Sequence, residues 1–271
     1  MKILILGDLH GFLLQKPKFE YDAVICTGDL CDDRFIRPFI QEGLRQECSW
    51  SELVTRDEKK QLIKQTISSG QRISKQLSNL GKPVYLIRGN WDIVMHKTYE
   101  QTYLGKKKNL HNCEFSYHEL DDCCIVGYDG SASPELPFDK QKWNSLSEQK
   151  QKRLLRTFTK KYTKFEKIYK KALKIGKPLI LLSHNQPNRT KLDKVTNKPA
   201  TIINKHLGSI VIRRIIDQFQ PKLCIAGHIH ENKGFSQLRK TKCLNAGSRA
   251  SAFVLDTQKW KIISKRIIMQ R

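Results

Sequence analysis

The sequence predicts an α/β fold, because short apolar runs alternate along the chain with longer segments of helical periodicity. Several of these runs end in a glycine followed by a polar side chain, as strands do when they present ligand-binding residues at the edge of an open α/β sheet. The chain has 271 residues, of which 39% are hydrophobic, and no linker rich in proline, glycine or serine divides it. We therefore expect a single domain over residues 1–271, with helical insertions at about 34–80 and 146–175.

The first two predicted strands are short and buried. Residues 3–7 (Ile-Leu-Ile-Leu-Gly) form the first strand, and Asp8 and His10 follow its carboxyl end. Because residues two apart in an extended chain point the same way, a carboxylate and an imidazole share one side there. Residues 22–27 (Asp-Ala-Val-Ile-Cys-Thr) form the second strand, which leads to Asp29. A carboxylate in that place is either a metal ligand or the cap of a turn or helix.

A long helical segment separates the second predicted strand from the third. Residues 34–80 carry apolar side chains at helical spacing, and Thr55-x-x-Glu58 predicts a capping box within them. The third strand, at 84–88 (Val-Tyr-Leu-Ile-Arg), leads to Gly-Asn-Trp-Asp at 89–92. A glycine followed by a ligand-type residue thus ends this strand as well.

The middle of the chain predicts a hairpin and a second long helix. Residues 113–128 contain two strand-like runs around a pair of aspartates, which predicts a β-hairpin. Residues 134–145 have the composition of a loop, and Ser145-x-x-Glu148 predicts another capping box. We expect the helix after it to occupy about 146–175.

This second helix is strongly basic. Between residues 140 and 177, fourteen lysines and arginines stand against only Glu148 and Glu166. The whole chain has a formal net charge of +24, and such a surface attracts phosphate-rich partners, so nucleic acid is one expected partner. The alternative is a solvated helix face, which is what runs of charge usually form.

The last part of the chain brings three histidines to strand ends. The strand at 179–183 ends at His184, and a long loop without periodicity follows it. A helix is predicted from about 209 to 219. The apolar run at 223–226 then ends at Gly227-His228-Ile229-His230. The final predicted strands are 241–245, 252–256 and 260–268.

Two histidines one residue apart place their rings on one side of a turn, and imidazoles are common ligands of transition metals. Alone, the pair also fits two solvent-facing loop histidines, but five strand ends now carry ligand-type residues. The seven expected ligands are Asp8, His10, Asp29, Asn90, His184, His228 and His230. Oxygen and nitrogen ligands without thiolate suit Mn, Fe or Zn better than a structural zinc site. Seven ligands suit two ions, the arrangement used for in-line displacement at phosphorus.

This ordered set resembles the calcineurin-like metallophosphoesterase superfamily, whose signature is D-x-H, G-D-x-x-D, G-N-H-[DE], H and G-H-x-H. It stands here as Asp8-Leu9-His10, Gly28-Asp29-Leu30-Cys31-Asp32, Gly89-Asn90-Trp91-Asp92, His184 and Gly227-His228-Ile229-His230. The resemblance covers nearly the whole chain. It implies a four-layer αββα sandwich, in which two mixed β-sheets packed face to face are flanked by helices.

The resemblance also implies a function and a ligand set. The function is that of a metal-dependent phosphoric ester hydrolase, acting on a phosphodiester or a phosphomonoester through a metal-bridging hydroxide. The cofactors would be two divalent ions, Mn first, with Fe, Zn, Ni and Mg as alternatives. The implied ligands are Asp8, His10, Asp29 and His230 for one ion and Asn90, His184 and His228 for the other, with Asp29 as the bridge. Asn90 and Asp92 would also have catalytic roles.

Trp91 departs from the family pattern, because the family usually has histidine after Gly-Asn. That histidine is thought to assist the leaving group or to stabilise the transition state, and branches that lack it typically hydrolyse diesters. The later stretch His184-x-x-Pro187-x-x-Thr190-Lys191-Leu192-Asp193, followed by His206-Leu207-Gly208-Ser209, is similar to the Icc-related predicted phosphoesterases of archaea and bacteria.

The long loop after His184 is the predicted substrate-binding segment. Ser209 fits the N-cap of the following helix, and the unpaired N–H groups of a helix start form an anion site. The expected substrate contacts are Asn185, Arg189, Lys205 and Ser209. His206 is predicted to supply the acid that Trp91 lacks, since its unperturbed pKa of about 6.5 suits proton transfer near neutrality. The alternative is a histidine that is hydrogen-bonded in a structural loop.

Composition and length limit the setting. Eight cysteines without a CxxC pair favour reduced thiols in a cytoplasm. No apolar run of about 18 residues predicts a membrane span, and the amino terminus is too short and too quickly polar for a signal peptide. Two alternatives to the enzyme stay open. One is a scaffold or binding module of the same fold without turnover, and the other is a nuclease or nucleic-acid-binding protein.

Overall fold

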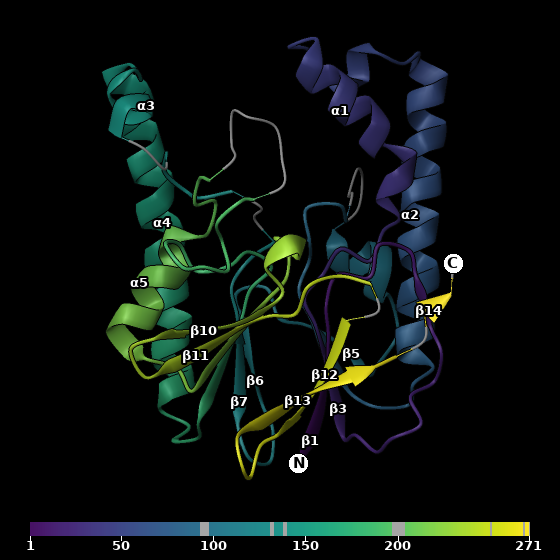
Figure 1. Cartoon of the computed structure of the whole chain (residues 1–271), viewed down its shortest axis with the longest axis vertical. Coiled ribbons are helices and arrows are strands. Elements are labelled where there is room, and N and C mark those ends of the chain that lie inside the picture. Colours follow the sequence, from purple (N-terminus) through teal and green to yellow (C-terminus); the bar gives the residue numbers. More distant parts are fainter. Residues whose placement is uncertain are drawn as a thin grey trace.

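The computed structural model describes residues 1–92, 98–130, 133–137, 140–196, 204–249, 251–267 and 269–270. Within these residues two six-stranded sheets lie face to face, with helices outside each of them (Figure 1). Both sheets mix parallel and antiparallel strands. The predicted αββα sandwich is therefore confirmed.

The first sheet is formed by strands from the two ends of the chain. Its order is β13 (Lys261–Arg266), β12 (Ser251–Asp256), β1 (Lys2–Leu6), β3 (Ala23–Cys26), β4 (Val84–Leu86) and β5 (Leu110–Asn112). The four strands β1, β3, β4 and β5 run parallel, and Ile5 of β1 lies opposite Ile25 of β3. β12 and β13 are antiparallel additions at one edge.

The second sheet is formed by the middle and later parts of the chain. Its order is β10 (Gly234–Leu238), β11 (Thr241–Asn245), β9 (Leu223–Ala226), β8 (Leu179–Leu182), β7 (Cys124–Gly127) and β6 (Ser116–Glu119). The strands β7, β8, β9 and β11 run parallel. β6 pairs antiparallel with β7, so the predicted hairpin within 113–128 is confirmed.

Three buried hydrophobic clusters separate the layers, one between the sheets and one under each helical layer. Residues 3–6 of strand β1 show why this part of the sequence is continuously apolar, whereas Lys2 at the start of the strand is exposed. Ile3 and Ile5 enter the cluster between the sheets, whereas Leu4 and Leu6 enter the cluster that includes α2 (Arg56–Ser78). A strand buried on both faces needs apolar residues at every position.

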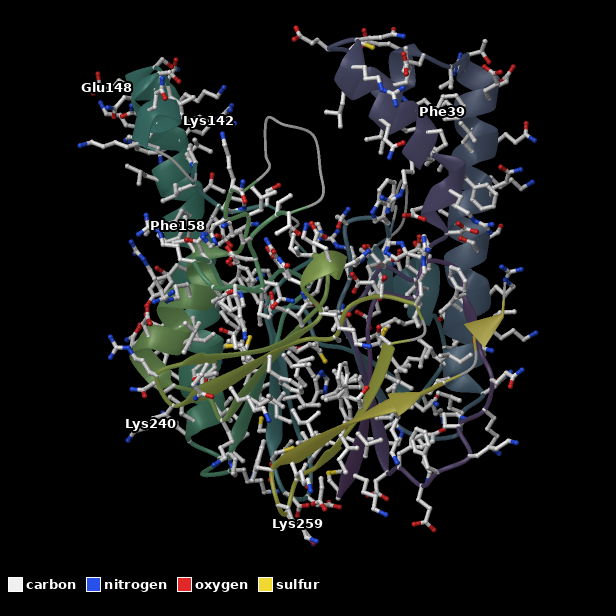
Figure 2. All side chains as sticks on the ribbon, in the orientation of Figure 1. Phe39, Lys142, Glu148, Phe158, Lys240 and Lys259 are labelled. Atoms are coloured by element: carbon white, nitrogen blue, oxygen red, sulfur yellow. The ribbon has the colours of Figure 1, made fainter. Side chains whose placement is uncertain are left out.

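The helices form two arms that extend beyond the sheets (Figure 1). One arm contains α1 (Arg37–Arg45) and α2, and the other contains α3 (Lys140–Asn144) and α4 (Glu148–Leu173), with α5 (Ile210–Phe219) beside α4. Glu148 at the start of α4 and Lys259 in the turn before β13 lie at opposite ends of the molecule (Figure 2).

Two local predictions for the second arm were wrong. The N-cap of α4 is Ser147, whose hydroxyl accepts from the backbone N–H of Lys150, so the capping box does not begin at Ser145. The segment 134–145, predicted to be a loop, contains the short helix α3, while residues 138 and 139 lie outside the described part. In contrast, the predicted capping box of Thr55 and Glu58 at α2 is confirmed.

The remaining differences concern short strands. β2 (Leu13–Leu14), β5, β10 and β14 (Met269–Gln270) were not predicted as strands of their own, because none of them combines the length and the continuous apolar sequence of the buried strands. The strand predicted at 260–268 begins at Lys261 and ends at Arg266, and residue 268 is not described. Among the described residues, none of the helices combines the length and the apolar character that a membrane span requires.

Candidate metal centre

The loops that follow five parallel strands meet at the upper end of the two sheets in the view of Figure 1. These loops follow β1, β3 and β4 in the first sheet and β8 and β9 in the second. Two overlapping groups of ligand atoms lie there within 4.8 Å of one another, Asp8–His10–His230 and Asp8–Asp29–His184. Parallel strands bring their carboxyl ends to the same edge, which explains why residues so far apart in sequence converge.

The first group is organised around Asp8. The Nε2 atom of His230 lies 3.0 Å from Oδ2 of Asp8 and 3.3 Å from Nε2 of His10. The same nitrogen of His10 lies 3.7 Å from Oδ2 of Asp29. Two imidazole nitrogens and two carboxylates therefore face one small volume, which is the donor arrangement of a cation site.

The second group is organised around His184, which is fully buried. Its Nδ1 lies 2.9 Å from the carbonyl oxygen of Thr27, and donation to that carbonyl leaves the Nε2 lone pair available to a metal. Nε2 lies 2.9 Å from Oδ1 of Asn90 and 3.5 Å from Oδ2 of Asp29. The ring of His228 is 5.0 Å from that of His184, between centroids. All seven predicted ligands are thus brought together.

The backbone of these loops takes unusual conformations at the ligands. His10 and Asp29 have φ of 46°, and His228 has φ of 64°, in the left-handed region that side chains other than glycine rarely adopt. A Cβ added to Gly227 would lie 2.1 Å from Oδ1 of Asp8, so only glycine allows that loop to approach the carboxylate. Local strain of this kind concentrates at functional sites.

The electrostatics of the cluster fit a bound cation. Burial raises the pKa of the Asp29 carboxyl well above its usual range, and the neighbouring carboxylates of Asp8 and Asp92 raise it further. Burial lowers the pKa of His10 to about 4, so its ring is neutral and available as a ligand near pH 7. Burial also acts against the charged form of Asp8, but His184 and other nearby histidines outweigh it and hold its pKa below the usual range. A divalent cation would stabilise the charged form of Asp29.

Other side chains hold the ligands in place, and no sequence pattern marks them. Thr27 donates its hydroxyl to Oδ1 of Asp8 at 2.6 Å, and the backbone N–H of His228 donates to Oδ2 at 2.7 Å. The buried Asn245 donates to the carbonyl oxygen of Ile229 at 2.7 Å, which fixes the turn between the two late histidines. Threonine just after a strand and asparagine before a turn have common structural uses, so neither stands out in sequence.

Asp92, predicted to be catalytic, is buried and joins two site loops. Its Oδ1 accepts from the backbone N–H groups of Leu30 and Cys31, at 2.8 and 3.2 Å, and its Oδ2 accepts from Gly89 at 2.8 Å. Burial raises its pKa. These contacts position Asp29 and Asn90 relative to each other, which is a positioning role.

The loop after His184 lies beside the centre and is pinned by Asp193. This buried carboxylate accepts from the backbone N–H groups of Arg189, at 3.1 Å, and of Gly208, at 3.0 Å. Its Oδ1 also lies 2.8 Å from Nδ1 of His206, whose side chain is 37% exposed. The carboxylate therefore orients His206 through Nδ1, while part of the side chain stays exposed.

Two hydrogen bonds connect this loop to the turn that begins at His230. Asn232, two residues after His230, donates to the carbonyl oxygens of Leu192 and Lys194. Lys194 in turn forms a β-bridge with His206. Of the other expected substrate contacts, Asn185 is buried and donates to the carbonyl of Leu207 at 2.8 Å, Arg189 is exposed and Lys205 is half-buried.

The helix start at Ser209 does not offer the anion site that was expected. Ser209 is the N-cap of α5, as predicted, and its hydroxyl accepts from Ile212 at 3.1 Å. However, the first N–H groups of the helix, those of Ile210 and Val211, donate to Oε2 of Glu135, and the hydroxyl of Ser209 donates to Oε1. A carboxylate of the chain itself occupies this place, so we do not include Ser209 among the proposed substrate contacts.

Comparisons with known proteins identify the family and the fold. A family model described as calcineurin-like phosphoesterase matches residues 1–232. A solved crystal structure aligns over 98% of this chain and 98% of its own, with a TM-score of 0.60 and 15% identity, and so shows the same fold. The structure of TT1561 of Thermus thermophilus covers 98% of both chains (TM-score 0.49, 12% identity). That of a dimetal phosphatase from Danio rerio covers 99% of this chain and 95% of its own (TM-score 0.45, 10% identity). No curated protein sequence matches the chain.

Proposed function

The chain belongs to the calcineurin-like phosphoesterase family, and on that premise we propose that it is a dinuclear-metal-dependent phosphoesterase. The observation that carries the proposal is the convergence of two overlapping ligand groups that share Asp8. Asp8, His10 and His230 would hold one ion, and His184, Asn90 and His228 would hold the second, with Asp29 between them. When bound, Mn²⁺ or a similar ion would lower the pKa of a water and offset charge on the phosphoryl oxygens.

The side chains of the site have separate tasks in this proposal. Asn90 is exposed, and its Oδ1 faces His184, so its amide N–H groups remain to donate to a substrate oxygen. Asp92 positions the two loops that carry Asn90 and Asp29. Arg189 and Lys205 stay proposed contacts for the distal part of the substrate, because the loop that carries them is tied to the centre.

Hydrolysis with and without metal tests the proposal directly. With Mn²⁺ present, the protein should hydrolyse bis-p-nitrophenyl phosphate, a diester, and activity should stop when a chelator removes the metal. A panel of monoesters and diesters measured in parallel assigns the substrate class. If metal binds but no ester is cleaved, the alternative of a scaffold or binding module without turnover replaces the enzyme.

Trp91 leads to a prediction about the leaving group. An indole cannot donate the proton that an imidazole would, and general acid catalysis is typically worth about 10²–10⁴-fold. The rate should therefore rise steeply as the leaving-group pKa falls across a series of aryl diesters, and activated esters should be preferred. A flat dependence, with the chemical step shown to be rate-limiting, would mean that another residue supplies the proton.

His206 is the proposed source of partial acid function, because Asp193 holds its ring at 2.8 Å. His206→Ala and His206→Gln should keep both metals and lower kcat/KM by up to about 10²-fold, the smaller end of the usual contribution of an acid or base. The acid limb of the pH–rate profile should change in both variants. Wild-type kinetics in either variant, on the true substrate, would leave His206 only its hydrogen bond in the loop.

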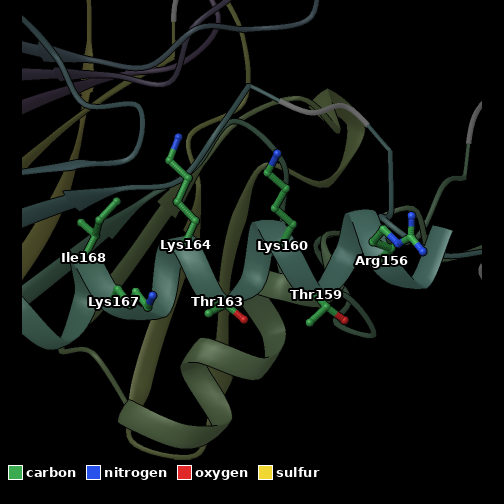
Figure 3. A pocket seen from close by; sticks show the side chains of 7 residues that line it. All are labelled: Arg156, Thr159, Lys160, Thr163, Lys164, Lys167 and Ile168. Atoms are coloured by element: carbon green, nitrogen blue, oxygen red, sulfur yellow. The ribbon is translucent and has the colours of Figure 1, made fainter. Parts of the chain in front are cut away.

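Nucleic-acid binding along α4 is a second candidate function, favoured by one observation. A shallow depression of about 690 Å³ follows this helix and is lined by basic and small polar side chains (Figure 3). Its lining residues are Arg156, Thr159, Lys160, Thr163, Lys164, Lys167 and Ile168. If α4 binds nucleic acid, counterion release should make the affinity fall steeply as the salt concentration rises. If the affinity is already weak at low salt, the basic residues of α4 form only a solvated surface.

A further inference from the structure

The position at which the family usually has histidine is covered by an arginine from the first helical arm. The guanidinium carbon of Arg37, the first residue of α1, lies 5.0 Å from the centre of the Trp91 ring. We propose that Arg37 binds an oxygen of the phosphate ester and supplies, as a fixed positive charge, part of the stabilisation that the missing imidazole would give. This inference rests on the proposed phosphoesterase function.

The hydrogen bonds of Arg37 leave one edge of its guanidinium available. Nε and Nη2 both donate to Oδ2 of Asp33, the first at 2.6 Å. In the described part of the chain, Nη1 makes no hydrogen bond, and the side chain is 38% exposed. Two N–H groups of a planar, permanently charged group thus remain for an oxyanion, which is the recognition that arginine performs best.

Both neighbours of Arg37 touch metal ligands, which places it at the edge of the centre. Oδ2 of Asp33 lies 3.5 Å from Nδ1 of His10, whose Nε2 faces the first ligand group. The backbone N–H of Trp91 donates to Oδ1 of Asp29 at 2.8 Å. Asp33 and Trp91 therefore fix the guanidinium next to ligands of both groups before any substrate arrives, and pre-organised charge costs no reorganisation during the reaction.

A purely structural role would be to neutralise Asp33, whose side chain is only 2% exposed. That role needs only the edge of the guanidinium formed by Nε and Nη2. It does not explain why the group is held against an aromatic ring while part of the side chain stays exposed. Arginine stays protonated throughout the working pH range, so it stabilises charge on oxygen but donates no proton. A site with Arg37 and Trp91 in place of histidine should therefore still discriminate strongly by leaving-group pKa.

Binding of inorganic phosphate to the metal-loaded protein tests the inference without relying on turnover. Arg37→Met should weaken phosphate binding, measured by calorimetry, by about tenfold or more, because it removes a charge-assisted hydrogen bond. Both metals should remain by elemental analysis. Arg37→Lys keeps the charge but loses the planar guanidinium, so its affinity for phosphate should lie between those of the wild type and of Arg37→Met. Arg45→Met is the matched control, since Arg45 ends the same helix and pairs with Glu42, and it should bind phosphate like the wild type.

Because Arg37→Met leaves Asp33 buried without its partner, the double variant Asp33→Asn/Arg37→Met accompanies it. If either variant retains both metals and binds phosphate as tightly as the wild type, the inference is overturned. If the phosphate affinity falls only together with the metal content in both variants, Arg37 has the structural role instead. A wild-type protein that binds two metals but neither binds phosphate nor cleaves esters would instead overturn the proposed function, and with it this inference.

Discussion

Replacement of Asp29 by Asn should nearly abolish hydrolysis and lower the bound metal, yet raise the melting temperature of the metal-free protein. Asp29 is fully enclosed, and burial, Asp8 and Asp92 all raise its pKa. A carboxyl whose pKa is raised in the folded state contributes stability below its unfolded pKa, near 4, and loses that contribution as the pH rises through the folded value. Above the unfolded pKa, keeping the Asp29 carboxyl buried therefore costs the metal-free protein free energy of folding, and asparagine removes that cost.

The two outcomes separate function from folding. Elemental analysis and turnover of bis-p-nitrophenyl phosphate measure the loss of bound metal and of activity. Thermal unfolding in the presence of a chelator measures the rise in the melting temperature of the metal-free protein. For a chain of this length, about 1 kcal/mol corresponds to about 2–4 °C. The difference in melting temperature between metal-free Asp29→Asn and the metal-free wild type should grow as the pH rises above about 4. Excess Mn²⁺ should stabilise the wild type more than the variant. Asp22→Asn, at the other end of the same strand, is the control, since Asp22 accepts from the backbone N–H of Lys2. Full metal content with an unchanged rate in Asp29→Asn would remove Asp29 from the ligand set.

The fold could be predicted because its signals are local. Strand segments buried on both faces must be apolar throughout, as residues 3–6 of β1 and all of β8 are, and such runs are visible without knowledge of their partners. The division of the strands into two sheets packed face to face came only from the family resemblance, and the order of the strands within each sheet was not predicted. Edge strands such as β10, whose burial is mixed, have no comparable signal. The start of α4 was misplaced because Ser145 and Ser147 both precede helix-forming residues, and only Ser147 accepts from the first turn.

The ligand set could be predicted for a different reason. Each ligand follows a strand whose end is marked in the sequence, and the carboxyl ends of parallel strands meet at one edge. Contacts made by loops carry no such rule. Glu135 occupies the anion site expected at Ser209, but it lies 75 residues before Ile210, the first residue of α5. Nothing in the sequence relates the two positions. Arg37 was hidden for the same reason, because its place over Trp91 depends on how the first arm packs.

His184→Ala should reduce the bound metal from two ions to one. Among the residues that the structure describes, two ligand groups share Asp8, and His184 belongs to only one of them. Its Nε2 lies 3.5 Å from Asp29, and donation from Nδ1 to Thr27 fixes the ring, so no neighbouring group replaces the lost nitrogen. Asp8, His10 and His230 remain to hold the first ion. Hydrolysis should fall by at least about 10²-fold, the cost of losing one pre-organised stabilising group in a catalytic site.

The reciprocal variant and a control make this result decisive. His10→Ala removes a ligand of the first ion, so it too should leave one ion, held by Asp29, Asn90, His184 and His228 as proposed above. The two one-ion proteins should differ in the pH at which metal is released, because different histidines compete with protons for the lone pair. His118→Ala, whose ring bonds to the carbonyl oxygen of Asn112, should keep two ions and full activity. If His184→Ala retains two ions, the second site does not depend on this histidine. If both variants lose all metal, the two ions bind only together, and neither site holds an ion alone.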